Sequence, residues 1–314
     1  MSLDFEKDVA EIESRIEEFK AKNPEPTGTL VKELNRLEME RAGKLKEIYA
    51  SLTPWQTVQV ARHPERPLIR DFIGGLCSEF IELHGDRLFG DDQGMIGGFA
   101  TIDNHRVMLI GHQKGKDLDE KIKCNFGQAC PEGYRKALRL MKLAEKFHIP
   151  VVTFIDTPGA FPGRDAEERG QAEAIARNLL EMAALKTPVI AVVTGEGGSG
   201  GAIGIGVGDI VLMLSNAVYS VISPEGCASI LWRDGTKAAE AANALKITAK
   251  SLLQLKIIDE IIPEPVGGAH RDFATTMKTT KKVLLKHLSS LEKVSSRKLT
   301  SRRFEKFAAM GRFK

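Results

Sequence analysis

The sequence predicts an α/β protein in which helices cover both faces of a central sheet. Through the middle of the chain, short apolar runs alternate with stretches whose apolar residues recur at helical spacing. Two of these runs, residues 151–155 and 189–193, are apolar on both faces, as a strand must be when helices cover it on both sides. The chain has 314 residues, of which 42% are hydrophobic, so it can bury a large core around such strands.

Residues 1–60 are predicted to form an N-terminal helical hairpin. Over residues 4–22 the apolar side chains recur every three or four positions, at Phe5, Val9, Ile12, Ile16 and Phe19. A break at residues 23–26, which holds two prolines, ends this helix, and a second helix is expected over residues 30–52. The two helices would lie antiparallel, an arrangement that usually packs or dimerises and does not itself catalyse.

Residues 61–266 are predicted to form the main α/β domain. A third helical stretch is expected from Pro54 to Leu83, where Gly85 interrupts the pattern. After it we expect, in order, strands at 95–102 and 107–110, a helix at 134–147, a strand at 151–155, a helix at 167–185, a strand at 188–193, a short helix from Gly200, and strands at 210–214 and 218–222.

Residues 267–314 are predicted to form a basic tail. From Lys278 onward the tail is rich in Lys and Arg and poor in acidic residues. Helical apolar spacing continues at Val283, Leu284, Leu288 and Leu291. We expect a basic amphipathic helix followed by a frayed end.

Composition argues against several classes of protein. The 45 Lys and Arg nearly balance the 42 Asp and Glu, so no overall field attracts the chain to nucleic acid or to an anionic membrane. The four cysteines include no Cys-x-x-Cys pair and no neighbouring His at zinc-site spacing, so we expect buried free thiols and no metal. The charged N-terminus and the lack of a run of about 18 apolar residues predict a cytoplasmic protein that does not bind membranes.

Two loops are the candidates for function, because they follow the two doubly apolar strands. Residues 156–163 combine prolines and glycines, which predict a rigid, shaped loop ahead of a helix. Residues 195–202 carry almost no side chains, so their N–H groups can line a concavity at the start of a helix. Five glycines within seven positions there favour the close approach of a ligand to the main chain, although any single glycine is better explained by packing.

Two catalytic motifs compete for these loops. Residues 197–201 satisfy the Gly-x-Ser-x-Gly pattern of serine hydrolases, with Ser199 followed by Asp259 and His270 in the required order. That pattern is short, and a glycine-rich stretch meets it by accident. The Asp-x-x-Gly at Asp156 resembles a magnesium-binding motif of nucleotide hydrolases, but residues 111–117 are one residue short of a phosphate loop and lack its Ser or Thr.

A third hypothesis is that paired amides stabilise an enolate-type oxygen, which requires no nucleophile, metal or histidine. Four runs of sequence add a family resemblance: residues 131–137, 154–160, 195–202 and 220–232. They resemble the alpha subunit of the bacterial acetyl-CoA carboxylase carboxyltransferase, and the resemblance extends from the N-terminal helices to about Val266.

The resemblance implies a crotonase-like fold, a superhelix of strand-strand-helix repeats, with the N-terminal hairpin and a C-terminal helix added. It implies a subunit that transfers the carboxyl group from carboxybiotin, held on the biotin carboxyl carrier protein, to acetyl-CoA. The product is malonyl-CoA, in the first committed step of fatty acid synthesis. The implied partners are a zinc-binding beta subunit, in an alpha2beta2 assembly, and biotin carboxylase. No metal is then expected on this chain.

In that family one subunit holds the thioester enolate oxygen and the alpha subunit holds the biotin ureido oxygen. Carried onto this chain, the resemblance implies catalytic amides at Gly200 and Gly201, with Gly197 and Gly198 shaping the turn. It also implies a biotin pocket with four wall residues, Gly159, Ala160, Phe161 and Gly163. Which amide pair donates is left open.

Other residues have simpler explanations. Lys114, Lys116 and Arg135 are candidates for binding acidic groups of CoA, but solvated cations are more often plain surface residues. Glu225 after Pro224 suits the start of a helix, and Cys227 suits a packed thiol. Two other functions stay open, a different acyl-CoA enzyme on the same fold, such as a biotin-dependent decarboxylase subunit, and a nucleic-acid-binding module that uses the basic tail. The tail's few aromatic residues argue against base stacking.

Overall fold

The computed structural model describes residues 3–311, and its centre is one mixed eight-stranded sheet. The strands are β1 (Glu79–Glu82), β2 (Met95–Ile102), β3 (His105–His112), β4 (Val151–Thr157), β5 (Val189–Gly198), β6 (Ile210–Leu214), β7 (Val218–Ser220) and β8 (Glu260–Ile262). They are ordered β1-β2-β3-β4-β5-β6-β8, and β7 pairs with β5. β1, β2 and β3 pair antiparallel, and the pairs from β3 to β8 are parallel.

β5 is long enough to pair with different partners along its length. Its first half lies between β4 and β6, while its last three residues pair with β7 in parallel register, from Glu196 opposite Val218 to Gly198 opposite Ser220. Strand-strand-helix order occurs at β2–β3–α6, apart from the short α5, and again at β6–β7–α10. This order is the repeat that the family resemblance implies.

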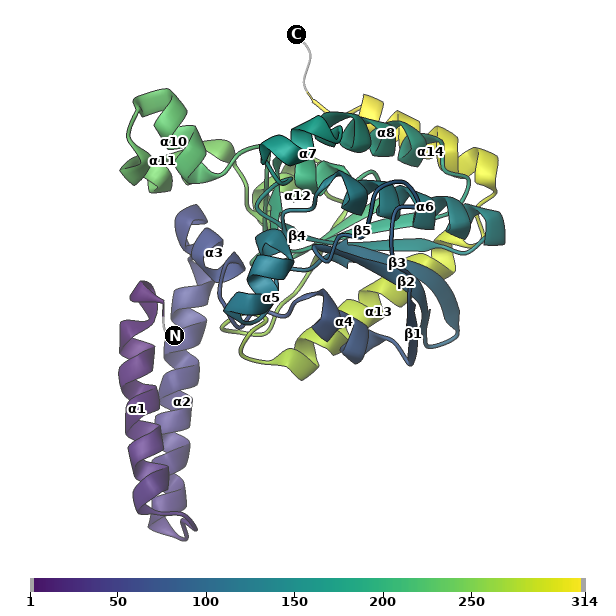
Figure 1. The fold of residues 1–314 in the computed structure, drawn as a ribbon. Helices are drawn as coiled ribbons and strands as arrows, with labels where there is room; N and C mark the ends of the chain where they lie inside the picture. Colours follow the sequence, from purple (N-terminus) through teal and green to yellow (C-terminus); the bar gives the residue numbers. More distant parts are fainter. Residues whose placement is uncertain (1–2, 312–314) are drawn as a thin grey trace.

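Helices cover both faces of the sheet (Figure 1). One face carries α6 (Pro131–Phe147) and α8 (Gln171–Ala184), and the other carries α4 (Ile69–Leu76) and α13 (Phe273–Leu291). The remaining helices are α1 (Lys7–Lys22), α2 (Thr29–Ala50), α3 (Pro54–Ala61), α5 (Leu118–Lys123), α7 (Arg164–Glu168), α9 (Ser199–Ile203), α10 (Pro224–Trp232), α11 (Ala238–Leu245), α12 (Ala249–Gln254) and α14 (Ser296–Ala308). Short 3-10 turns occupy Asp4–Glu6, Asn125–Gly127 and Gly235–Lys237.

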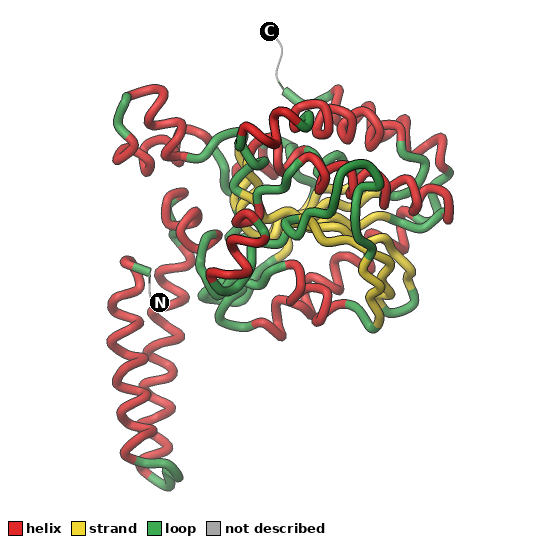
Figure 2. The backbone as a smooth tube through the Cα atoms, viewed as in Figure 1, coloured by secondary structure: helices red, strands yellow, loops and turns green. Residues whose placement is uncertain are grey.

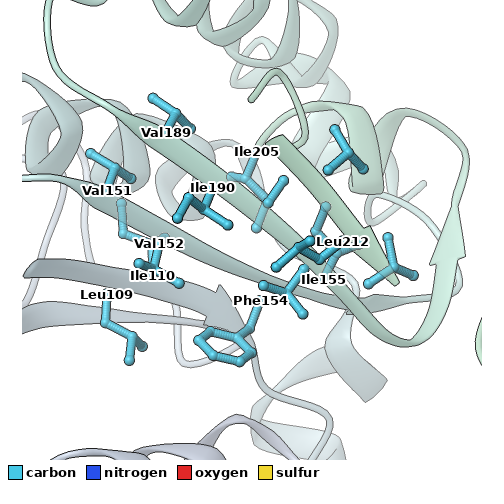
Figure 3. Packing of buried hydrophobic residues seen from close by; sticks show 14 of the residues in the cluster. Leu109, Ile110, Val151, Val152, Phe154, Ile155, Val189, Ile190, Ile205 and Leu212 are labelled. Carbon is cyan, nitrogen blue, oxygen red and sulfur yellow. The ribbon is translucent and has the colours of Figure 1, made fainter. Parts of the chain in front are cut away.

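The core is centred on β4 and β5, as predicted. Every residue of both strands is buried. Figure 3 shows their aliphatic side chains packed with those of β3 and β6 and with Ile205. On one face the ring of Phe154 packs against that of Phe72 in α4, with ring centroids 5.2 Å apart. Burial of apolar side chains on both faces explains why these two strands lack the polar alternation of an exposed sheet.

The N-terminal helices α1 and α2 form an antiparallel hairpin, as predicted, and project away from the sheet (Figure 2). Ile12, Ile16 and Leu37 form a small core of their own between the two helices. At the base of the hairpin the buried carboxylate of Glu6 accepts a hydrogen bond from Tyr49 at 2.8 Å and pairs with Arg271 at 3.1 Å. The hairpin is therefore joined to the rest of the chain mainly by polar contacts at one end.

Several predicted elements differ from the structure. The stretch from Pro54 to Leu83 is two short helices, α3 and α4, followed by β1, an edge strand in which exposed and half-buried residues alternate. The single helix predicted at 167–185 is broken by Gly170, whose φ of 82° is left-handed. The tail does not fray after its first helix, because α14 continues to Ala308. The prediction that residues 1–60, 61–266 and 267–314 are separate units remains a prediction.

Arg303 fixes α14 to the body of the protein. Its buried guanidinium donates hydrogen bonds to the carbonyl oxygens of Met182, Leu185 and Thr187 at 2.6, 2.8 and 2.9 Å. It also forms an ion pair with Asp209 at 2.7 Å. The three carbonyl groups lie between the end of α8 and the start of β5, where the last carbonyls of a helix need donors. A basic residue of the tail is thus an internal structural group.

We expect Arg303→Leu to lower the free energy of unfolding by about 3–5 kcal/mol, because it leaves Asp209 buried and unpaired. Urea denaturation of the purified chain measures this change. Arg302→Leu is the matched control, since Arg302 is exposed one position away and should shift stability by less than about 0.5 kcal/mol. Equal effects of the two substitutions would contradict the structural role of Arg303.

Candidate functional site

The two predicted loops meet at one edge of the sheet. β4 and β5 are parallel neighbours, so the loops that follow them leave the sheet side by side. The first loop runs from Pro158 to α7, and the second is the sharp junction at which β5 ends at Gly198 and α9 begins at Ser199. Ser199 adopts a left-handed backbone conformation, with a φ of 50°. The junction turns there without a loop residue between strand and helix.

The loops touch through their backbones at Gly201. A Cβ atom on Gly201 would lie 2.5 Å from the carbonyl carbon of Gly159 and 2.8 Å from the nitrogen of Ala160. A Cβ on Gly198 would lie 2.2 Å from the carbonyl oxygen of Pro158. Real side chains do not tolerate such distances to backbone atoms, so these glycines are required for the two loops to approach each other.

Gly197 is also a packing glycine. It lies within β5 and not in the turn, and its Cβ would lie 2.9 Å from the ring of Tyr219 in β7. A Cβ on Gly195, two positions earlier, would lie 2.3 Å from the carboxylate of Asp156. The sequence predicts that a ligand comes close to the main chain at these positions. In the structure, side chains of the protein occupy that space.

Gly200 differs from its neighbours. A Cβ there would meet only the Cδ1 atom of Ile175, at an ordinary 3.5 Å. Gly200 is half-buried and the preceding Ser199 is exposed, so the main chain is accessible at this point. The amides of Gly200 and Gly201 lie in the first turn of α9, where N–H groups have no acceptor within the helix. Of the four predicted glycines, Gly200 is the one that packing leaves unexplained.

The first loop is held rigid by its own hydrogen bonds. The Thr157 hydroxyl donates to the Gly159 carbonyl at 2.7 Å and accepts from the Gly159 N–H at 3.1 Å. The Phe161 N–H donates to the carbonyl of Ala129 at 3.1 Å, and Gln171 donates to the Phe161 carbonyl at 2.9 Å. These contacts fix the peptide against which Gly201 packs. The predicted wall residues Gly159, Ala160, Phe161 and Gly163 all belong to this held loop or its end.

Ion pairs hold the ends of β4 and β5 just before the two loops. Asp156, which is 4% exposed, forms an ion pair with Lys114 at 2.5 Å and accepts the N–H of Glu196 at 2.9 Å. The carboxylate of Glu196 pairs with Arg62 at 2.6 Å, and Arg62 also pairs with Glu225 at 2.6 Å. Although partial burial opposes ionisation of Glu225, its bonds to Arg62 hold the pKa of this carboxyl below its usual value.

The cations considered for CoA binding have partners within the chain. Lys114 pairs with Asp156, Lys116 with Asp71 at 2.6 Å, and Arg135 with Asp86 at 2.8 Å. Glu225 lies in the first turn of α10, and Cys227 is buried behind it, so both have the structural roles that the sequence favours. The other cysteines are free as well, and all but the half-buried Cys77 are buried.

Sequence reasoning did not single out His112, the buried last residue of β3. The side chain is 1% exposed. Burial lowers the pKa of His112 to about 4, an effect that the nearby Asp156 only partly opposes, so the imidazole is neutral at pH 7. The sequence offers a weak signal, because a histidine directly follows the apolar run of β3.

The serine hydrolase constellation is not assembled. Asp259 accepts the N–H of Val211 and pairs with Lys306. His270 stacks on His63 with ring centroids 3.9 Å apart, near the base of the hairpin. Over residues 3–311, no group of three or more His, Cys, Asp and Glu side chains is placed to hold a metal ion. Nor does any helix in that range combine the length and apolar character that a membrane span requires.

Comparison with solved structures identifies the class of fold. The transcarboxylase 12S subunit, solved with methylmalonyl-coenzyme A, aligns with 79% of this chain and 43% of its own at a TM-score of 0.56 and 19% identity. A subunit of the Pseudomonas malonate decarboxylase hetero-tetramer, solved with coenzyme A, aligns with 76% of this chain and 94% of its own at a TM-score of 0.59 and 15% identity. The chain thus has the crotonase-like fold of the carboxyltransferases, and it spans less than half of the transcarboxylase chain.

Sequence comparison then identifies the family. Residues 2–311 match the family described as acetyl co-enzyme A carboxylase carboxyltransferase-like. The acetyl-coenzyme A carboxylase carboxyl transferase subunit alpha of Geobacter metallireducens is 56% identical over 312 residues, which cover 99% of this chain and 98% of that protein. This chain belongs to the carboxyltransferase alpha-subunit family. The resemblance therefore continues through the tail, beyond the limit near Val266 that the motifs alone had set.

We expect Gly201→Ala to destabilise the protein more than Gly200→Ala does. The first places a Cβ on the Gly159 backbone and should cost about 1–3 kcal/mol by overpacking. The second makes only an ordinary contact with Ile175 and lies in a helix, where alanine is favoured, so it should change the free energy of unfolding by no more than about 1 kcal/mol. Thermal and urea unfolding of both variants measure this difference. Equal destabilisation would mean that the two loops are not packed as described.

Proposed function

We propose that this chain supplies the carboxybiotin side of the acetyl-CoA carboxylase carboxyltransferase. In this proposal the complex moves a carboxyl group from carboxybiotin on the carrier protein to acetyl-CoA and forms malonyl-CoA. The family match over residues 2–311 supports the reaction. The observation that carries the site is the accessible main chain at Gly200, beside a Gly201 that is clamped against Gly159 and Ala160.

The proposed site works by donating backbone hydrogen bonds. Bound carboxybiotin supplies the carboxyl group, and its ureido oxygen gains negative charge as that group leaves. The amides of Gly200 and Gly201 would donate hydrogen bonds to this oxygen. These bonds strengthen as the negative charge on the oxygen grows, so they stabilise the transition state more than the bound carboxybiotin. Gly159, Ala160, Phe161 and Gly163 would wall the ring, and the hydrogen bonds of Thr157 and Gln171 keep that wall in place.

In this proposal the chain forms only part of the active site. It contributes donors for one oxygen, and the thioester oxygen of acetyl-CoA would be held by a zinc-binding beta subunit in an alpha2beta2 assembly. Exposed apolar side chains on and beside α10, Val221, Ile230 and Leu231, support contact with a partner chain. Figure 1 shows α10 and α11 standing away from the sheet. The carrier protein and biotin carboxylase would complete a cytoplasmic enzyme.

We expect the purified chain alone to form no malonyl-CoA from carboxybiotin and acetyl-CoA, because one oxygen site is missing. Addition of the beta subunit should restore the reaction. An assay of carbon dioxide release from malonyl-CoA, run in parallel, tests the alternative that the chain serves a biotin-dependent decarboxylase. Malonyl-CoA formation by the isolated chain would overturn the division of the site between two subunits.

We expect Gly200→Val to lower kcat of the reconstituted complex by about 10²–10³-fold, the loss typical of one oxyanion donor, because its methyl groups obstruct the amides. Folding and assembly should be near normal, since a Cβ at this position makes only an ordinary contact with Ile175. Ser199→Ala is the matched control and should retain most activity, because Ser199 has no catalytic partner. Near-normal turnover by Gly200→Val would move the proposed donors to Gly159 and Ala160. Labelling of Ser199 by a fluorophosphonate would instead favour a hydrolase.

A further inference from the structure

The turn that follows α9 accepts hydrogen bonds from two buried polar side chains of the core. Asn178 lies in the row of α8 residues that is buried, and Thr153 lies at the centre of β4, where its neighbours in the strand are apolar. Both residues are 0% exposed. A buried polar group is costly unless it forms hydrogen bonds, so the partners of these two side chains indicate what they contribute.

Both side chains donate to carbonyl groups of this turn. Nδ2 of Asn178 donates to the Gly204 carbonyl at 2.9 Å and to the Tyr134 carbonyl of α6 at 3.0 Å. The Thr153 hydroxyl donates to the Ile205 carbonyl at 2.8 Å. The side chain of Ile205 is itself packed in the core (Figure 3). The turn is therefore attached to α8 and to β4 by separate hydrogen bonds.

The turn is linked to one of the proposed donors through the backbone of α9. The Gly204 N–H donates to the Gly200 carbonyl at 3.0 Å. That carbonyl belongs to the same planar peptide unit as the Gly201 N–H, so a bond that restrains the carbonyl also restrains the direction of the N–H. α9 has only five residues, and its largest side chain, Ile203, is 40% exposed. So short a helix needs tertiary contacts to stay formed.

We propose that Asn178 and Thr153 are positioning residues for the carboxyl transfer, which hold the C-terminal end of α9 and so set the direction of the Gly201 N–H. The inference rests on the function proposed above for that amide. The backbone contact of Gly201 with Gly159 holds the other end of the helix. Because the two hydrogen bonds come from different elements, α9 cannot pivot about a single one. Oxyanion donors need placement within about 0.5 Å, and contacts at both ends of α9 supply that precision.

The test removes one hydroxyl group and keeps the size of the side chain. Thr153→Val replaces the hydroxyl by a methyl group, whereas Thr153→Ser keeps the hydroxyl and leaves a small cavity. In the isolated chain, hydrogen–deuterium exchange of residues 200–206 should rise about tenfold in the valine variant and much less in the serine variant. In the complex reconstituted with the beta subunit, kcat of the valine variant should fall about tenfold or more, since a displacement of about 1 Å at a catalytic site is enough for such a loss. KM for acetyl-CoA should be unchanged, and serine should restore most of kcat.

The matched control is Thr187→Val. Thr187 is also buried, and its hydroxyl donates to the Ile149 carbonyl at 2.7 Å. It precedes the start of β5, at the opposite end of that strand from α9. Its substitution should lower the melting temperature about as much as Thr153→Val does, and it should leave kcat and the exchange of residues 200–206 unchanged.

Asn178→Leu removes the other bond to the turn and should change exchange and kcat in the same direction as Thr153→Val. Asn178→Ser, which keeps one donor in a smaller side chain, is the second variant should the leucine variant fail to fold, and it should show a smaller effect of the same kind.

Unchanged exchange of residues 200–206 in Thr153→Val would overturn the inference, and the proposed function would stand as long as Gly200→Val still lowers kcat. Equal falls in kcat for Thr153→Val and Thr187→Val would also overturn it, because lost stability would then explain both. Faster exchange in Thr153→Val without a lower kcat would overturn the positioning role as well. If Gly200→Val were then equally active, the proposed function would fail with it.

Discussion

The contact between the backbones of Gly201 and Gly159 is the constraint on which the site depends. Parallel pairing of β4 and β5 brings both loops to one edge of the sheet, but the loops meet only because no side chain stands between them. Backbone atoms alone form this contact, so it contributes little hydrophobic stabilisation. Neighbouring groups must therefore fix its geometry, and the hydrogen bonds between Thr157 and Gly159 do so in the first loop.

Those surroundings contain several ion pairs that are wholly or partly buried. The Lys114–Asp156 and Arg62–Glu196 pairs lie near the ends of β4 and β5, and Arg66 pairs with Glu264 in full burial at 2.7 Å. Burial alone would raise the pKa of Glu264, yet Arg66 and two backbone amides hold it below its usual value. Buried pairs of this kind add little net stability compared with apolar packing. Their contribution here is directional, because each fixes the position of a strand end that apolar contacts would leave free to slide.

The sequence predicted the fold and both loops but not the roles of single residues within them. Strands such as β2 and β6 were predicted at their observed bounds because an apolar run needs only local pattern to be recognised. β1 was missed because it has only four residues and its Phe80 also fits helical spacing. The role of Arg303 depends on carbonyl groups far away in the chain, which no local pattern records. The distinction between Gly200 and Gly201 depends on where the other loop lies.

Contacts within this chain already hold the two loops against each other, and this has a consequence for assembly. The conformational entropy lost in fixing a loop is of the order of 1–2 kcal/mol per residue, and here the loss accompanies folding of the chain and not association with a partner. In the proposed complex, a second subunit would then add its own oxygen site without ordering this one. The proposed half-site would also stay formed between catalytic cycles, when the carrier protein leaves. The glycines allow the two loops to come close together. The residues around them keep the junction rigid, and a rigid junction is what preorganised hydrogen-bond donors require.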